Sequence, residues 1–591
     1  MNTSRSSAVS AKKPPTAPQR VERVQPVGDV IPFGQGWYQA VALLNSLLAG
    51  CAFLCHTSSD RLTSRVLDHW CRPPDTYGNV SADEWKHLAI PRHEDGTYSQ
   101  CTRRDPPDAG EFSQIVSCVS WDFDRKDSGE LIVSEWLLVC DQRWLLDAGF
   151  FIYSTISLMW LPVLGTAADR VGRKIVVVLS VPALLFTGFA SLVTGSFQSF
   201  VALRVVVSGT TAALLVTLIV VLYEVTVPAQ RTGSCYTALA LMHISAALAM
   251  TAARTIRLGW RYIYLVPMLP TSLHVVMFLT VDESYSWLMT TWRTKVAERV
   301  ALFAAWMNGV SADECVTALT KTVQGMAQVI EGDATGKSPR ESIFSPELRQ
   351  RSLLFCFIWC VVHYCYSQIT RAGSLPLNKT TVVAAALSMA PAHIACYAAV
   401  CRFGTKRLAI VAMLLLSASS TFMAAAYNSS PNTALVHAMT AVLRVMASVV
   451  SSLCICLPIE AYPIRTRCMG VSFAFAVGWA IGNGSELALR HTPIQRTDVS
   501  LVSMSLLTVI AAMAVNNLPL PGFGDDDSTS TFSRRASIAS KDDIRRSFME
   551  SLVPLPKRPI MTRKKSARNI DCLPEQFSLR LSRISLHSDS E

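Results

Sequence analysis

The stretch Gly165-Thr166-Ala167-Ala168-Asp169-Arg170-Val171-Gly172-Arg173-Lys174 separates two long apolar runs, 145–164 and 175–193. Each run is about long enough to cross a bilayer as one helix. Because buried charge is costly inside a membrane, a polar segment between two such helices must lie at a membrane surface. Its three cations predict that this surface faces the cytoplasm, since cytoplasmic loops are rich in Lys and Arg. The stretch therefore predicts a hinge between two spanning helices; an ordinary basic loop is the alternative.

The composition indicates a membrane protein with several spans. Half of the 591 residues are hydrophobic, 16% are charged, and the mean hydropathy is +0.31. Apolar runs of about 18 residues or more predict an all-α membrane protein with twelve transmembrane helices. The expected spans are 36–55, 145–164, 175–194, 199–222, 235–253, 262–280, 352–370, 381–400, 408–427, 434–457, 469–487 and 499–517. The net charge of +11 is the excess expected on cytoplasmic loops and tails, so it does not indicate a nucleic-acid partner.

These spans divide the chain into five parts. The parts are a cytoplasmic N-terminal segment 1–35, an N-terminal half 36–280 that includes an external loop 56–144, a cytoplasmic central loop 281–351, a C-terminal half 352–517 and a cytoplasmic tail 518–591. The N-terminal segment is basic and lacks a signal-peptide core, so we expect it to stay inside. We expect the central loop to form helices that pack against the cytoplasmic ends of the bundle.

The tail is rich in Ser, Arg, Asp and Lys and has little apolar periodicity, so the sequence predicts disorder. Ser537 and Ser547 follow pairs of arginines, a pattern that suits basophilic kinases as partners. A solvated tail with chance matches is the alternative.

The external loop contains four cysteines, Cys71, Cys101, Cys118 and Cys140. In the oxidising exterior, four cysteines allow two disulfides in any of three connectivities. A zinc site is the weaker alternative because no close C-x-x-C pair occurs, and we expect no metal. Asn79 begins a glycosylation sequon in the same loop, so we also expect a glycan there.

Several motifs occur in an order typical of one transporter family. They are His69-Trp70-Cys71-Arg72-Pro73-Pro74, Cys118-Val119-Ser120-Trp121-Asp122-Phe123-Asp124, Glu135-Trp136-Leu137-Leu138-Val139-Cys140-Asp141, Trp260-Arg261, Glu283-Ser284-Tyr285-Ser286-Trp287-Leu288 and Ala305-Trp306-Met307-Asn308-Gly309. Over roughly residues 35–517 the chain resembles solute carrier family 22, the organic cation, organic anion and carnitine transporters. The stretch 165–174 likewise resembles the hinge between helices 2 and 3 of the major facilitator superfamily. The resemblance implies two pseudo-symmetric six-helix halves around a central cavity.

The two predicted halves repeat each other, as expected for this fold. Glu224 precedes Arg231 after span 4, and Glu460 precedes Arg467 at the same interval after span 10. The stretch 401–407 is a degraded copy of the hinge. The resemblance implies a cytoplasmic gate in which hinge charges pair with Glu224, Arg231 and the ends of second-half helices. The predicted gate residues are Gly165, Asp169, Arg170, Gly172, Arg173, Lys174, Glu224, Arg231, Glu460 and Arg467.

Ionisable and aromatic residues inside the spans are candidates for the substrate cavity. The predicted cavity residues are Arg444, Trp479, Tyr366, His363 and Trp359. Arg444 matches a basic position of the family, whereas Trp479 and Ser452 stand where cation transporters carry acids. An ordinary core residue is the alternative for His363. Arg204 also matches a family position, with snorkelling to the outer interface as its alternative.

The sequence thus predicts a multi-pass membrane transporter of small organic solutes, which works by alternating access through facilitated diffusion or exchange. The missing cavity acids favour lipophilic anions, zwitterions or neutral compounds. The alternatives are an organic cation transporter and a non-transporting binding or scaffolding protein of the same fold. No Gly-rich phosphate loop, H-E-x-x-H or nucleophile elbow occurs, so we expect neither an enzyme nor a cofactor. We expect the plasma membrane as the location, with both termini in the cytoplasm.

Overall fold

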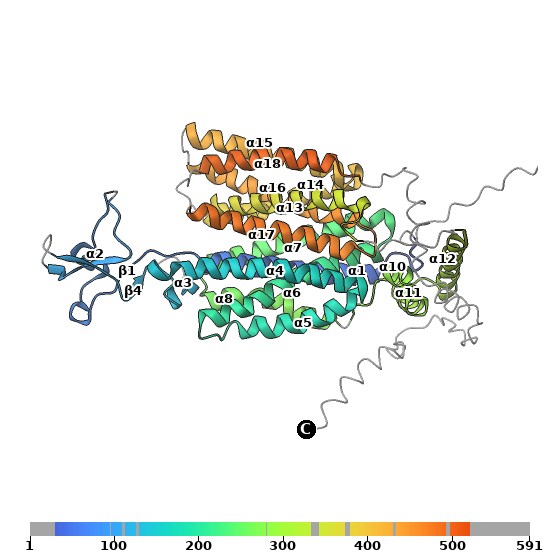
Figure 1. Ribbon diagram of the computed structural model, residues 1–591, viewed down its shortest axis with the longest axis horizontal. Coiled ribbons are helices and arrows are strands. Elements are labelled where there is room, and N and C mark those ends of the chain that lie inside the picture. Colours follow the sequence, from blue (N-terminus) through green and yellow to red (C-terminus); the bar gives the residue numbers. More distant parts are fainter. Residues whose placement is uncertain are drawn as a thin grey trace, which may run out of the picture. The chain divides into compact units, whose positions relative to one another are not determined.

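Long, nearly parallel helices dominate the computed structural model (Figure 1). The structure describes residues 30–519 except 95, 109–112, 126–128, 279, 333–341, 373–378, 430–432 and 492–496. The predicted kinase sites at Ser537 and Ser547 lie outside the described residues, as does most of the predicted N-terminal segment.

The helices form because their apolar runs must satisfy every backbone polar group internally in a lipid environment. The N-terminal half contains α1 (Trp37–Thr63), α4 (Arg143–Arg170), α5 (Arg173–Ala190), α6 (Phe197–Val225), α7 (Arg231–Thr255), α8 (Trp260–Leu265) and α9 (Met268–Phe278). The C-terminal half contains α13 (Pro346–Ala372), α14 (Lys379–Phe403), α15 (Thr405–Ser429), α16 (Thr433–Ala461), α17 (Arg467–His491) and α18 (Thr497–Asn516). Among the described residues, nine helices are long and apolar enough to cross a membrane.

The structure corrects the predicted bounds at three places. The first helix continues to Thr63, although the predicted span ends at 55. The predicted span 262–280 is divided into α8 and α9, which meet at Pro267, a residue that cannot donate a helical hydrogen bond. The hinge 165–174 is largely helical, because α4 continues to Arg170 and α5 begins at Arg173. The chain reverses at Gly172, whose φ of 143° favours glycine.

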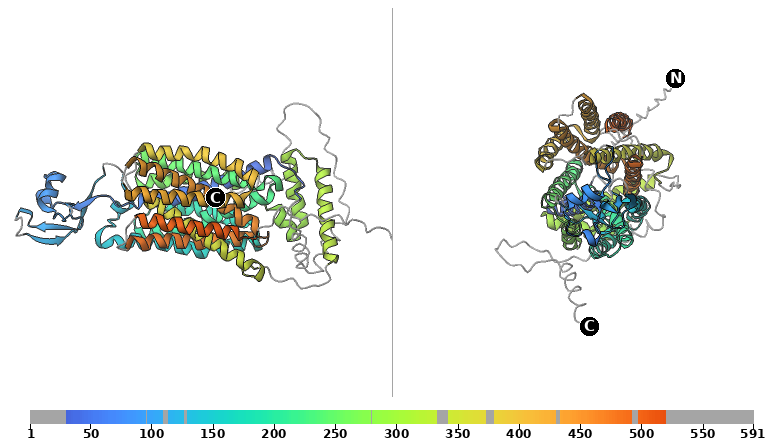
Figure 2. Two further views of the ribbon diagram at one scale, coloured as in Figure 1. Left: turned by 90° about the horizontal axis from the view of Figure 1, so that it is seen from above. Right: turned by 90° about the vertical axis from the view of Figure 1, so that its left-hand side faces the viewer.

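The two sets of helices lie against each other. Figure 2 (right) views them along their length, with the blue-to-green helices in one group and the yellow-to-red helices in the other. Helix α4 packs against α17, and α7 packs against α14 and α16. One hydrophobic cluster joins residues of both halves, among them Phe53 and Ile219 of the first and Val361 and Phe475 of the second.

The segment between α1 and α4 carries two small antiparallel sheets. Strand β1 (His69–Cys71) pairs with β4 (Trp121–Phe123), and β2 (Thr102–Asp105) pairs with β3 (Gln114–Ser117). The short helices here are α2 (Ala82–Ala89), α3 (Ile132–Glu135), η2 (Asp75–Tyr77) and η4 (Cys140–Gln142). Disulfides join Cys71 to Cys118 and Cys101 to Cys140, which is one of the three predicted connectivities. Asn79 is exposed in this segment.

This segment is attached to the helices by an ion pair and an aromatic cluster. The Glu135 carboxylate accepts two hydrogen bonds from Arg261, at 2.6 and 2.7 Å, and one from the Trp260 indole. Trp136 packs against the Trp260 ring and against Phe200. The family-like motifs Glu135–Asp141 and Trp260-Arg261 therefore meet, although they are far apart in the sequence.

The central loop forms α10 (Tyr285–Thr290), α11 (Thr294–Asn308) and α12 (Ala312–Gly332), and η5 (Pro228–Gln230) precedes α7. These central helices pack beside the start of α1 in a shared hydrophobic cluster. The Asn308 amide donates to the Phe33 carbonyl at 2.9 Å and accepts from the Tyr38 backbone N–H at 3.0 Å. The central helices thus cover the ends of the bundle, on the side where α4 and α5 meet.

The exposed position of Asn79 generates a test of the predicted glycan. If the segment between α1 and α4 lies outside the cell, Asn79 is accessible to the glycosylation machinery. We expect enzymatic removal of N-glycans to increase the gel mobility of the wild-type protein and to leave Asn79→Gln unchanged. Asn483→Gln is the control, because Asn483 also begins a sequon but is buried within α17. This variant should show the same mobility shift as the wild type. A mobility shift retained in Asn79→Gln would show that Asn79 is not glycosylated.

Candidate functional site

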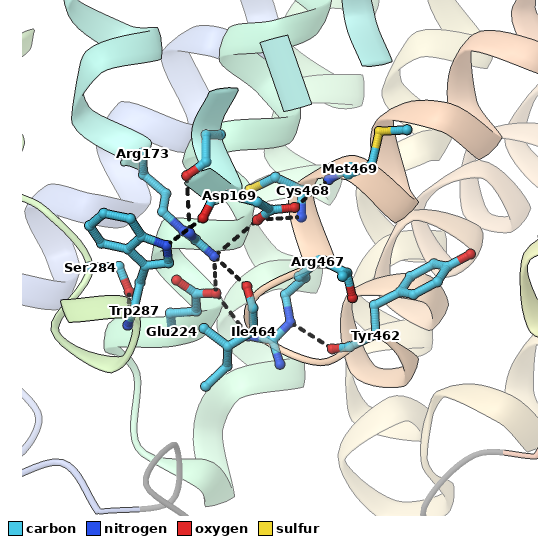
Figure 3. A network of polar contacts seen from close by, with 12 residues as sticks. Asp169, Arg173, Glu224, Ser284, Trp287, Tyr462, Ile464, Arg467, Cys468 and Met469 are labelled. Carbon is cyan, nitrogen blue, oxygen red and sulfur yellow. Dashed lines mark hydrogen bonds and ion pairs between the residues drawn. The ribbon is translucent and has the colours of Figure 1, made fainter. Parts of the chain in front are cut away.

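The Glu224 carboxylate, near the end of α6, binds two arginines (Figure 3). Its Oε1 atom lies 3.1 Å from Arg173 Nη2 and 2.9 Å from Arg467 Nη1. All three side chains are buried, and Arg173 has no exposed surface. Arg173 begins α5 in the first half and Arg467 begins α17 in the second, so one buried carboxylate connects the two halves. Such charge-assisted hydrogen bonds are strong where water is excluded.

Asp169 makes a second connection between the halves. Its carboxylate accepts hydrogen bonds from the backbone N–H groups of Cys468, at 3.2 Å, and Met469, at 2.8 Å. These groups belong to the first turn of α17, whose N–H groups have no partner within the helix and lie at its positive end. Asp169 also lies 3.3 Å from Arg173. Asp169 therefore caps a helix of the other half.

Close packing of α4 on α17 depends on Gly165. A Cβ atom at this position would lie 2.9 Å from the Cys468 carbonyl oxygen and closer still to the Ser472 side chain. Any larger residue at 165 would therefore move α4 away from α17, and with it the Asp169 carboxylate.

Other groups hold Arg173 in place. Its guanidinium donates to the carbonyls of Ile464, at 2.6 Å, and Ala168, at 3.1 Å. The Trp287 indole beneath it donates to the Asp169 carbonyl at 2.8 Å. The Glu283 carboxylate accepts from the backbone N–H of Arg173 at 2.8 Å and so caps α5. Burial raises the pKa of the Glu283 carboxyl, against the opposing effect of its backbone donors.

Glu460, the counterpart of Glu224, has a different environment. Its carboxylate accepts hydrogen bonds from the hydroxyls of Thr232, at 2.7 Å, and Thr405, at 2.8 Å. These threonines belong to α7 and α15, so Glu460 also connects the halves, but through neutral donors. The charged network is therefore concentrated around Glu224.

The remaining predicted gate residues lie at the edge of this network. Lys174 pairs with Asp282 at 3.4 Å. Arg231 donates to the Thr226 carbonyl at 3.0 Å, and its guanidinium lies 5.3 Å from the Tyr223 ring. Arg170 is exposed and forms no ion pair with any described residue, so the predicted pairing of Arg170 with the second half is not seen in this conformation.

A cavity of about 40 Å³ lies between the halves. It is lined by Phe53, Leu54, Thr57, Arg61, Leu215, Met242, His243, Val362, His363, Tyr366, Ser451, Ile455, Phe475, Trp479 and Asn483. The predicted residues His363, Tyr366 and Trp479 are among them. Trp359 packs behind this wall, 4.9 Å from the Phe475 ring, and Arg444 lies half-buried on α16 without lining the cavity.

Sequence reasoning missed Arg61, the one side chain with a permanent charge among the described residues of the cavity wall. Its guanidinium lies 5.3 Å from the centre of the Tyr366 ring, across the gap between the halves. The predicted first span ends at 55, which places Arg61 in the predicted external loop. The extra two turns of α1 carry it into the bundle.

The same extension places Asp60 beside Arg204. The two side chains are buried and 2.9 Å apart, and Asp60 also accepts a hydrogen bond from the Tyr264 hydroxyl at 2.6 Å. The alternative for Arg204, snorkelling to the outer interface, is therefore wrong. Arg204 instead connects α6 to α1 within the first half.

Solved structures with a similar fold are transporters. The chain superposes on the xylose transporter XylE of E. coli, a proton:xylose symporter of the major facilitator superfamily, with a TM-score of 0.56 and 14% identity over 81% of this chain and 95% of that chain. A double-tryptophan mutant of XylE gives a TM-score of 0.57, with 14% identity over 85% of this chain and 98% of that one. The fold is therefore that of the major facilitator superfamily.

Curated proteins with similar sequences give the family. Mouse solute carrier family 22 member 7 is 24% identical over 69% of this chain and 79% of its own length. The beta-alanine transporter of Drosophila melanogaster is 23% identical over 82% of this chain and 85% of its own length. No family model matches the chain. These similarities support the predicted resemblance to solute carrier family 22. The findings confirm the prediction of a multi-pass transmembrane transporter.

The shared carboxylate of Glu224 generates a prediction about stability. In Glu224→Gln the buried Arg467 guanidinium loses the Glu224 charge and Arg173 keeps only Asp169, and breaking a buried ion pair in this way costs about 3–5 kcal/mol. We expect the purified protein to unfold at a clearly lower temperature, as measured by the fluorescence of its tryptophans. Arg170→Gln, in the same motif but exposed, should leave the unfolding temperature unchanged. Equal unfolding temperatures for wild type and Glu224→Gln would contradict the assigned network.

Proposed function

We propose that the chain transports small organic carboxylates by alternating access, and that the network around Glu224 and Asp169 is its cytoplasmic gate. The observation that carries this proposal is a set of ion pairs and helix caps between the halves at one end of the bundle, together with a separate cavity that has a cationic and aromatic wall. Because the sequence contains no nucleotide-binding motif, we infer that gradients rather than ATP drive transport, as in facilitated diffusion or exchange.

The size of the cavity supports a closed conformation. Sites for organic ligands usually measure about 300–1,000 Å³, whereas this cavity of about 40 Å³ holds little more than water. Binding a solute therefore requires the halves to separate. At the end where α4 meets α17, separation breaks the contacts of Glu224 with Arg467 and of Asp169 with the first turn of α17. When the halves separate, the carboxylates of Glu224 and Asp169 exchange these partners for water. The network therefore has two discrete arrangements, one closed and one open.

The positive charge of the hinge supports a cytoplasmic position for this end of the bundle. The segment with the disulfides then lies outside, in the oxidising environment where disulfides persist. This topology agrees with a plasma-membrane protein whose termini are both cytoplasmic.

The charges of the wall support an anionic or zwitterionic substrate. The described wall contains Arg61 and no Asp or Glu, so an organic cation finds no counter-charge there. Aromatic faces could offset its desolvation by only about 0.5–2 kcal/mol each. A carboxylate finds Arg61, and Phe475 and Trp479 suit an apolar or aromatic body. One relative is named a beta-alanine transporter, and beta-alanine carries a carboxylate. This similarity also supports a substrate with a carboxylate.

The proposal is tested by uptake into proteoliposomes. We expect saturable uptake of radiolabelled benzoate, and a loss of about tenfold in uptake at low concentration in Arg61→Ala, equivalent to about 1.4 kcal/mol. Arg444→Ala should have a smaller effect because Arg444 does not line the closed cavity. Arg402→Ala, an exposed arginine at the end of α14, is the matched control.

Two results would oppose the proposal in different ways. Saturable uptake of tetramethylammonium that is indifferent to both Arg61 and Arg444 would establish an organic cation transporter. Specific binding of benzoate to the purified protein without accumulation in vesicles would establish a ligand-binding protein that does not translocate.

A further inference from the structure

Two histidines face each other where the halves meet in the middle of the bundle. His243 lies on α7 of the first half and His393 on α14 of the second, and their rings stack with centroids 5.9 Å apart and an angle of 26°. Both side chains are buried, at 5% and 2% exposure. His243 also lines the central cavity, whereas His393 lies behind it. The gate network contains neither residue.

Hydrogen bonds assign the tautomer of His393. The Ser448 hydroxyl donates its one proton to the Val445 carbonyl at 2.7 Å, so it accepts from His393 Nε2 at 3.2 Å. The other ring nitrogen, Nδ1, then carries a lone pair and accepts from the Tyr236 hydroxyl at 2.9 Å. Both nitrogens of neutral His393 are therefore satisfied.

The same reasoning applies to His243. Its Nδ1 lies 2.9 Å from the Leu239 carbonyl, which only accepts, so Nδ1 carries the proton. The Ser452 hydroxyl, 3.3 Å from this nitrogen, donates to the Ser448 carbonyl at 3.0 Å. The lone pair of His243 is therefore on Nε2, and this ring is the one that borders the cavity.

The charges around the pair do not favour an imidazolium. The titratable groups on the surrounding helices include Tyr236 on α7, Cys396 on α14, Cys456 and Glu460 on α16, Arg61 on α1 and His363 on α13. Glu460 is the carboxylate among them, and it accepts hydrogen bonds from Thr232 and Thr405. A cation on His243 would thus have a neutral ring beside it and Arg61 across the cavity.

We propose that His243 and His393 form a proton-binding site, and that its protonation separates α7 from α14 and α16. A hydronium ion in the cavity transfers its proton to His243 Nε2 and becomes water, an N–H bond forms, and the positive charge stays on the imidazolium. A buried charge without a counter-charge is costly, so the protonated pair favours a conformation in which water reaches this interface. Protonation and separation of the halves are then linked, and the linkage is reciprocal.

This inference extends the proposed function without depending on the substrate. A transporter whose halves separate more readily when a proton is bound can use a proton gradient to bias its cycle. The site differs from the gate because it joins the halves through neutral hydrogen bonds and a stacked ring pair rather than through ion pairs.

Amide hydrogen exchange of the full-length protein in lipid nanodiscs tests the site without any solute. Between about pH 7.5 and about pH 5.5, after correction for the intrinsic pH dependence of exchange, we expect exchange in peptides of α7 and α14 to rise at least about threefold. His243→Gln and His393→Gln should each abolish this rise. His274→Gln is the control, because His274 is a buried histidine on α9 outside the pair.

Each result decides for or against the site. A rise that persists in both His243→Gln and His393→Gln, or no rise in the wild type, would overturn the proposal and leave the pair as a structural contact. If one variant does not fold, as judged by its elution as a monodisperse protein, the other and Tyr236→Phe still report on the same network. Because no solute is present, a failure here is distinguishable from a failure of benzoate transport.

Discussion

One buried carboxylate, Glu224, pairs with two buried guanidiniums that come from different halves of the protein. Arg173 and Arg467 have little or no access to water, so neither charge is tolerable there without a partner. This constraint places the start of α5, the end of α6 and the start of α17 at one point. The Asp169 cap on α17 and the close approach at Gly165 depend on the same placement.

The gate and the cavity have different physical characters. At the proposed gate, fixed charges and helix ends connect the halves, and each contact has a discrete partner. Around the cavity, aromatic rings and neutral hydrogen bonds connect the halves, with Arg61 as the charged side chain of the described wall. A transporter of organic solutes needs both: a wall that adapts to an apolar body, and a distant contact that opens in an all-or-none manner.

The sequence predicted the helices well because apolar runs of about 20 residues are a strong signal. The meeting of Asp169, Arg173, Glu224 and Arg467 was predicted only through the family resemblance, since no local spacing brings α4 to α17. The partners of Asp169 are backbone N–H groups, which leave no side-chain signal in the sequence. Arg61 was missed because charges near the end of an apolar run are ordinarily read as the end of a span. The disulfide pairing needed the structure, because four cysteines allow three connectivities.

The central claim is that the carboxylate of Glu224 holds the halves together at one end of the bundle. Spin labels on unnatural amino acids at positions 170 and 402, which are exposed on α4 and α14, allow the distance between the halves to be measured by pulsed electron resonance with all native cysteines in place. The account predicts one narrow distance distribution in the wild type and a second, longer population when Glu224 is replaced by Gln. Identical distributions in the two proteins would contradict it.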